Sequence, residues 1–185
     1  MDLHTTTASG GIFSIATDEE ESCRIAQELH APVILGMLRN LNGTTLHYFT
    51  NENFSIDTTA VCFESGQHEE LDSVKNAVSA IINCLRSIGC LNAHDVENKH
   101  DELLIRMSSN LPKVAEMLYC HPVEEEDQFV MHPGYLNFQT IEKGELLAKD
   151  KKGEIRSKED GLILMPLYQT IGEDGFFLIR TVEGY

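Results

Sequence analysis

The sequence predicts an α/β fold over about residues 1–110, followed by a small all-β domain over about 111–185. In the first part, apolar segments with helical spacing alternate with short, uninterrupted apolar segments, which is typical of a parallel or mixed sheet covered on both faces. In the second part the apolar segments are short and are separated by glycine-containing turns, as in small β domains. The composition, 42% hydrophobic and 24% charged, is that of a globular chain that can bury a core.

Two segments of the first part have helical spacing. Residues 18–30 follow a capping-box pattern formed by Thr17 and Glu20, and the segment ends before Pro32. The second helix is predicted over residues 71–88 and ends at Gly89, where a helix commonly stops. Its apolar residues recur at intervals of three and four, at Leu71, Val74, Ala77, Val78, Ile81, Ile82, Leu85 and Ile88.

Short apolar segments predict the strands. In the first part these segments cover residues 33–38 and 58–63. The acidic segment 92–102 fits a solvated helix or a linker, and its periodicity does not decide between them. In the second part the predicted strands cover residues 114–119, 129–131, 145–148, 154–156, 161–165 and 176–182.

Charge and cysteine content limit the partners of the chain. With 14 basic and 30 acidic residues the formal charge is −16, which excludes a nucleic-acid binder that relies on a basic face. The apolar segment 162–168 is interrupted by Pro166 and is far shorter than a membrane span, so we expect no membrane partner. Five cysteines without a CxxC pair, and an N-terminus without a basic flank, favour the cytoplasm as the location.

Three sequence strings carry a family resemblance. They are DLHTT at residues 2–6, CFESGQH at 62–68 and GLILMPLYQ at 161–169. Their order and spacing resemble the succinylglutamate desuccinylase/aspartoacylase family, zinc-dependent deacylases related to the zinc carboxypeptidases. The resemblance is strongest over residues 129–180 and implies a partial zinc-carboxypeptidase-like mixed sheet with flanking helices, followed by a barrel-sandwich-like β domain.

The resemblance implies a role for two residues. Glu64 follows an apolar strand, and a carboxylate there lies at the edge where α/β sheets usually build their sites. Such a carboxylate can take a proton from a water that attacks an amide carbonyl, so the resemblance makes Glu64 the catalytic base. His4 matches one zinc ligand of the family, and Asp2 can orient a neighbouring group.

The predicted substrate is a small N-acyl amide or a related ester. The family places substrate-contacting residues in the loop that contains Gly43–Phe49, and we choose Thr45 and His47 there because a hydroxyl and an imidazole can orient an acyl group. Aspartoacylase-like members carry an arginine at about the position of Leu46, and that arginine binds a carboxylate of the substrate. Because this chain has leucine instead, the resemblance does not extend to N-acetylaspartate as the substrate.

The zinc site is incomplete in this sequence. The family's other two ligands lie in an HxxE segment upstream of the DLH string, whereas the two HxxE strings here, His94–Glu97 and His121–Glu124, come after Glu64 and are as frequent as chance predicts. A catalytic zinc normally has three protein ligands, so His4 alone should bind the metal weakly. We therefore expect a truncated chain, with roughly 100 or more further N-terminal residues in the complete protein.

Other interpretations stay open. His4 fits a surface histidine near a chain end, and Glu64 fits an ordinary strand-end carboxylate. The β-rich part also looks somewhat like a lipoyl or biotinyl carrier domain, in which a lysine at a hairpin tip, here Lys151, carries the cofactor. That alternative is a non-catalytic binding module. Whether the chain forms a homo-oligomer is not decided by the sequence.

Overall fold

The computed structural model describes residues 1–41 and 43–183, which form two compact units. The first unit contains residues 1–5, 11–116 and the C-terminal segment from 181, and the second contains 6–10 and 117–180. Strand β5 (Val114–Pro122) begins in the first unit and ends in the second. The predicted domain division at residue 110 stays a prediction.

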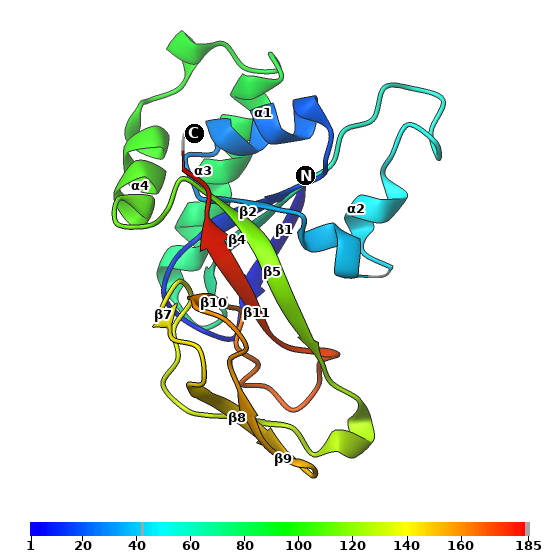
Figure 1. Ribbon diagram of the computed structural model, residues 1–185. Coiled ribbons are helices and arrows are strands. Elements are labelled where there is room, and N and C mark those ends of the chain that lie inside the picture. The colour runs from blue at the N-terminus through cyan, green and yellow to red at the C-terminus, as the bar shows by residue number, and fades with distance from the viewer. Residues whose placement is uncertain (42, 184–185) are drawn as a thin grey trace. The chain divides into compact units, whose positions relative to one another are not determined.

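The first unit is built on a mixed sheet. Strand β2 pairs antiparallel with β4 and parallel with β3, and β3 pairs parallel with β5. The predicted α/β class is therefore confirmed. The strands lie in the order β1 (Asp2–Thr6), β4 (Val61–Gln67), β2 (Phe13–Ala16), β3 (Val33–Leu35) and β5 (Figure 1).

Both predicted helices are present in the first unit. They are α1 (Glu20–Glu28) and α3 (Leu71–Ser87), and α3 packs against α1, α4 and β4 (Figure 1). The predicted capping box is wrong, because the N-cap of α1 is Glu19 and Thr17 instead donates its backbone N–H to Ser22 Oγ, at 2.9 Å. The remaining helical elements are α2 (Thr45–Tyr48), α4 (Lys99–Ser108) and the 3₁₀ turns η1 (Met37–Asn40) and η2 (Ala93–Asp95).

The core of the first unit lies between α1, α3 and the sheet. Phe63 of β4 is fully buried in this core. Because side chains alternate along a strand, the next residue, Glu64, projects from the opposite face of β4. The core consists of Ile12, Ala16, Ile25, Ala26, Leu29, Ala31, Val33, Val61, Phe63, Ala80 and Leu104.

The second unit contains short antiparallel strands, and every strand predicted after residue 110 is present. β10 (Gly161–Leu164) pairs with β7 (Thr140–Ile141) and with β11 (Asp174–Thr181). A second sheet contains β6 (Val130–Met131), β8 (Leu146–Asp150) and β9 (Gly153–Arg156), after the 3₁₀ turn η3 (Glu125–Asp127). A separate all-β domain over residues 111–185 is not confirmed, because the second unit also includes residues 6–10 of the N-terminal segment.

Asn137 holds the N-terminal segment within the second unit. Its buried amide donates to the carbonyl oxygen of Ala8 at 3.0 Å and to the hydroxyl of Thr6 at 3.2 Å, and its side-chain oxygen accepts from the backbone N–H of Met165 at 2.7 Å. Gly10 has a φ of +121°, and a Cβ there would lie 2.6 Å from the Asn137 carbonyl oxygen. Glycine is therefore required at this close approach.

Candidate active site

Strands β1 and β4 are neighbours in the first unit (Figure 1). Asp2 and His4 of β1 lie close enough to Glu64 of β4 for their charges to act on its carboxyl group. Ser65 Oγ donates to the backbone carbonyl oxygen of His4 at 2.9 Å and so joins the two strands. The predicted strand 58–63 ends too early, because β4 continues to Gln67. Glu64 therefore lies inside the strand rather than after it, and only 4% of its surface is exposed.

Burial dominates the electrostatics of Glu64. Burial raises the pKa of the Glu64 carboxyl to about 7. The charge of His4 lowers this pKa and the charge of Asp2 raises it, but both effects are smaller than that of burial. Glu64 Oε2 is buried and has no hydrogen-bond partner among residues 1–41 and 43–183. A carboxyl group with a pKa near neutrality can both take up and release a proton under ordinary conditions, as a general base must.

His4 is the most accessible member of this group. More than half of its side chain is exposed, and its Nε2 lies 3.1 Å from Asp2 Oδ1. Asp2 and His4 are two residues apart on β1, so their side chains share one face of the strand. This carboxylate–imidazole pair orients the ring beside Glu64.

The buried carboxyl group makes stability depend on pH. The pKa of this carboxyl is about 7 in the folded chain, compared with an ordinary value of 4.5, so between these pH values the folded state binds more protons and stability falls as pH rises. We expect the metal-free chain to lose about 3 kcal/mol of unfolding free energy through this group between pH 4.5 and pH 7. Glu64→Gln should lack this loss, whereas the exposed-site control Glu69→Gln should retain it, as measured by urea unfolding at pH 5 and pH 8. Equal pH slopes for all three proteins would contradict the prediction.

The described residues do not complete a zinc site. His4 offers one imidazole, and Glu64 offers a buried carboxylate with a free oxygen atom. Across the part of the chain that the structure describes, no cluster of three or more His, Cys, Asp or Glu side chains is arranged to hold a metal ion. A catalytic zinc needs about three protein ligands, so these residues alone do not fit the metal.

Of the two predicted substrate-contacting residues, only Thr45 lies near Asp2. Both residues belong to the short helix α2, whereas the family resemblance predicts a loop there. Thr45 lines a cavity of about 170 Å³ together with Met1, Asp2, Leu46, Phe49, Thr59, Ala60 and Val61. Glu64, His4 and His47 do not belong to this lining.

His47 uses its imidazole within its own segment. Its Nε2 lies 3.1 Å from the carbonyl oxygen of Leu38, and its Nδ1 lies 2.8 Å from the hydroxyl of Thr44. Because a carbonyl oxygen only accepts, Nε2 carries the proton and Nδ1 accepts from Thr44. Both ring nitrogens therefore stabilise the loop around α2.

Sequence reasoning missed the polar side of α3, which holds the end of β4. Asn76 Nδ2 donates to the backbone carbonyl oxygen of Ser65 at 3.0 Å, and Ser73 Oγ donates to that of Gln67 at 2.6 Å. Gly66 has a φ of +125°, and a Cβ there would lie 2.8 Å from Ser73 Oγ. The signal in the sequence is the spacing of small polar residues at Ser73, Asn76, Ser79 and Asn83.

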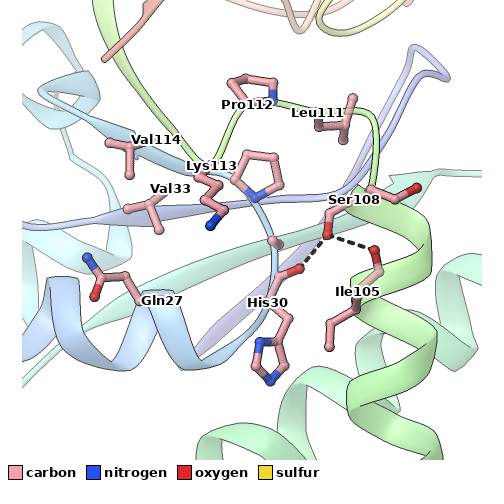
Figure 2. A pocket seen from close by; sticks show the side chains of 12 residues that line it. Gln27, His30, Val33, Ile105, Ser108, Leu111, Pro112, Lys113 and Val114 are labelled. Carbon is pink, nitrogen blue, oxygen red and sulfur yellow. Dashed lines mark hydrogen bonds between the residues drawn. The ribbon is translucent and has the colours of Figure 1, made fainter. Parts of the chain in front are cut away.

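Another cavity of the first unit, of about 560 Å³, contains none of the predicted site residues (Figure 2). It lies between the segment from His30 to Val33 and the segment from Ile105 to Val114. Figure 2 shows Ser108, whose hydroxyl donates to the backbone carbonyl oxygen of His30 at 2.6 Å. His30 Nε2 lies 3.1 Å from Asp101, which also accepts from Arg86 at 2.8 Å.

The remaining candidate residues lie in ordinary structural settings. His94 is exposed in η2, and the ring of His121 stacks on Phe176 with centroids 5.0 Å apart. Lys151 does lie at a hairpin turn, between β8 and β9, and its ammonium group is 3.3 Å from Asp127 Oδ1. No helix in the described ranges has the length and apolar character needed to cross a bilayer.

Comparison with known proteins identifies the fold. No family model and no curated protein matches the sequence. Among solved structures, the ectoine utilization protein EutE from Ruegeria pomeroyi matches with a TM-score of 0.60 and 17% identity, and a succinylglutamate desuccinylase from Silicibacter sp. TM1040 with 0.60 and 16%. Murine aminoacylase 3 matches with 0.57 and 15%. The chain has the succinylglutamate desuccinylase fold.

The likeness covers nearly all of this chain but only part of each neighbour. It extends over 97–98% of the chain, and over 56% of EutE, 56% of the succinylglutamate desuccinylase and 62% of aminoacylase 3. The chain thus spans little more than half the length of these structures. The DLHTT, CFESGQH and GLILMPLYQ strings predict a resemblance to part of this family's fold. The solved structures confirm that resemblance for the fold, and it extends over only part of each neighbour.

Proposed function

We propose that the chain provides the catalytic base of a deacylase that hydrolyses a small N-acyl amide or a related ester. The observation that carries this proposal is the buried Glu64 carboxyl, with its pKa of about 7, on the strand next to His4. The succinylglutamate desuccinylase fold supports a hydrolase of this kind, since two of its structural neighbours are named as a desuccinylase and an aminoacylase. Fold alone does not set function, so the site residues carry the argument.

Glu64 would act by moving one proton. Its Oε2, which is free of protein hydrogen bonds among the described residues, accepts a proton from the water whose oxygen bonds to the carbonyl carbon of the substrate. The same oxygen then gives the proton to the amine as the carbon–nitrogen bond breaks. The products are a carboxylic acid and a free amine, or an alcohol from an ester.

We further propose that the complete enzyme is zinc-dependent, with His4 as one ligand. When bound, the ion would supply the positive charge that stabilises the negative oxygen of the attacked carbonyl. The other ligands would have to come from outside the described residues, because these residues do not complete a site. Thr45 is the better candidate for substrate contact, since it shares a cavity with Asp2 whereas the ring of His47 is already bonded. A cytoplasmic location also stays a prediction.

A test on the natural full-length protein separates these claims. We expect about one zinc per chain by elemental mass spectrometry and hydrolysis of members of an N-acyl amino acid panel, with both lost on chelation and restored by zinc. His4→Ala should lose the metal and the activity, and the control His132→Ala, at an exposed histidine, should keep both. A His4→Ala protein with full zinc and full activity would contradict the role of His4.

A further inference from the structure

The segment that contains helix α2 places three aromatic rings in contact with one another at the surface. The rings of Phe49 and Phe54 are stacked with centroids 5.2 Å apart, and Tyr48 meets both of them edge-on, at 5.4 and 5.5 Å. Tyr48 is 62% exposed and Phe49 is 42% exposed. We call these three residues the α2 aromatic cluster. Exposed apolar side chains that are grouped in this way mark a binding surface more often than single exposed residues do.

The cluster borders the cavity of about 170 Å³ described above, which we call the α2 cavity. Phe49 belongs to both, and Leu46, Ala60 and Val61 supply further apolar wall. The volume suits one ring, because an apolar cavity of about 150 Å³ engineered in another protein binds benzene. The α2 cavity therefore fits a single six-membered ring, aromatic or aliphatic.

The charge of the lining selects against an acidic group. Among the described residues that line the cavity, Asp2 has the one charged side chain, and none has a basic side chain. The carboxylate of Asp2 lies 3.1 Å from His4 Nε2. A carboxylate of a ligand would lose its water in this cavity and meet a like charge, with no guanidinium group to offset either cost. The lining is thus complementary to an uncharged group.

The α2 cavity lies along the strand that carries Glu64. Ala60 lines the cavity directly before β4, and it is four residues from Glu64 along extended chain. The two side chains therefore project from the same face, with their Cα atoms about 13 Å apart. Asp2 also joins the two places, because it lines the cavity and its charge acts on the Glu64 carboxyl. A ligand that reaches both places must carry its ring several bonds away from the carbonyl group beside Glu64.

We propose that the α2 cavity binds an uncharged ring that the substrate carries several bonds from the amide or ester to be hydrolysed. This inference rests on the proposed function, since the role of Glu64 places the bond that is cleaved. Phe49 forms a wall against the ring, and its stacked contact with Phe54 holds it in place. Phe49 and Thr45, which also lines the cavity, determine specificity and take no part in proton transfer.

Two acetamides of equal chain length test the proposal by binding alone. N-acetyl-4-phenylbutylamine ends in a ring, and 5-acetamidopentanoate ends in a carboxylate. The full-length protein is freed of metal with a chelator, so that no turnover occurs, and is titrated with each compound by isothermal calorimetry. We expect the ring-ended compound to bind at least about tenfold more tightly, because the cavity can accept an uncharged group but offers a carboxylate no partner.

Variants at exposed lining positions assign that preference to the α2 cavity. Phe49→Ala removes one wall and should weaken N-acetyl-4-phenylbutylamine about tenfold, while the affinity for 5-acetamidopentanoate stays unchanged. Thr45→Phe should fill the cavity and abolish the preference for the ring. The control is Ile56→Ala, an exposed apolar residue of the same segment outside the lining, which should bind both compounds like the parent. Circular dichroism establishes that each variant is folded, as expected for exposed positions.

Equal affinities for the two acetamides would overturn the proposal, and so would a Phe49→Ala or Thr45→Phe protein that keeps the parental affinity for the ring. Failure of the proposed function is distinguishable. In that case the ring preference and its loss in the variants remain, but the zinc-loaded protein hydrolyses no N-acyl compound. Conversely, hydrolysis of N-acyl compounds without any preference for a ring would overturn only the role of the α2 cavity and leave that of Glu64 intact.

Discussion

If the protein is the deacylase proposed above, Glu64→Gln is expected to lower its kcat/KM by about 10²–10⁴-fold, the usual contribution of a positioned general base. Glutamine has nearly the same size and fills the same buried space, but its side chain cannot accept a proton from water near neutral pH. The measurement is the initial rate of hydrolysis of the best N-acyl substrate, together with the zinc content of each protein.

The matched control is Glu69→Gln, an exposed carboxylate soon after β4, which should leave kcat/KM unchanged. Zinc content should be the same in both variants, because Glu64 is assigned to proton transfer and not to metal binding. If the Glu64→Gln protein hydrolyses substrate at the parental rate, Glu64 is not the base and the proposed function loses its main support.

Phe63→Ala is expected to destabilise the chain by about 3–5 kcal/mol, because it removes a fully buried aromatic ring from the core of the first unit. That amount is a large part of the roughly 5–15 kcal/mol that holds a typical domain folded. Guanidinium unfolding followed by circular dichroism gives the change in unfolding free energy.

Ile56→Ala provides the comparison for this core substitution. Ile56 is 72% exposed, so its truncation should change the unfolding free energy by no more than about 0.5 kcal/mol. A loss below about 1 kcal/mol for Phe63→Ala would show that the region around β4 is more loosely packed than the structure indicates.

Much of the fold could be predicted from the sequence, because in most elements the local residue pattern agrees with the burial of those residues in the folded chain. The uninterrupted apolar residues from Val33 to Leu35 form a strand that is mostly buried, and Gly89 does follow the end of α3. In the second unit, Lys151 and Lys152 form the turn between β8 and β9, and Gly153 begins β9, so a glycine-containing turn does separate these two predicted strands. The family strings also led to the fold that the solved structures share.

The errors arise where tertiary contacts override the local pattern. The apolar pattern predicts a strand that ends at Phe63, yet β4 continues to Gln67 and buries Glu64. The apolar spacing located α3 but could not show which side faces inward, because hydrogen bonds from Ser73 and Asn76 to β4 decide that. The imidazole of His47 suits contact with a substrate, but its bonds to Thr44 and Leu38 depend on a local geometry that residue spacing does not reveal.

The bonds of Asn137 also bear on how the chain reaches its native state. Residues 6–10 leave the ribosome before Asn137 is made, so the hydrogen bonds of this segment to Asn137 form only after more than 120 further residues have been synthesised. Contacts this distant in sequence close slowly. A fragment that starts at residue 117 would lack the two acceptors of the Asn137 amide, and boundaries drawn for separate expression of the second unit should therefore include the N-terminal segment.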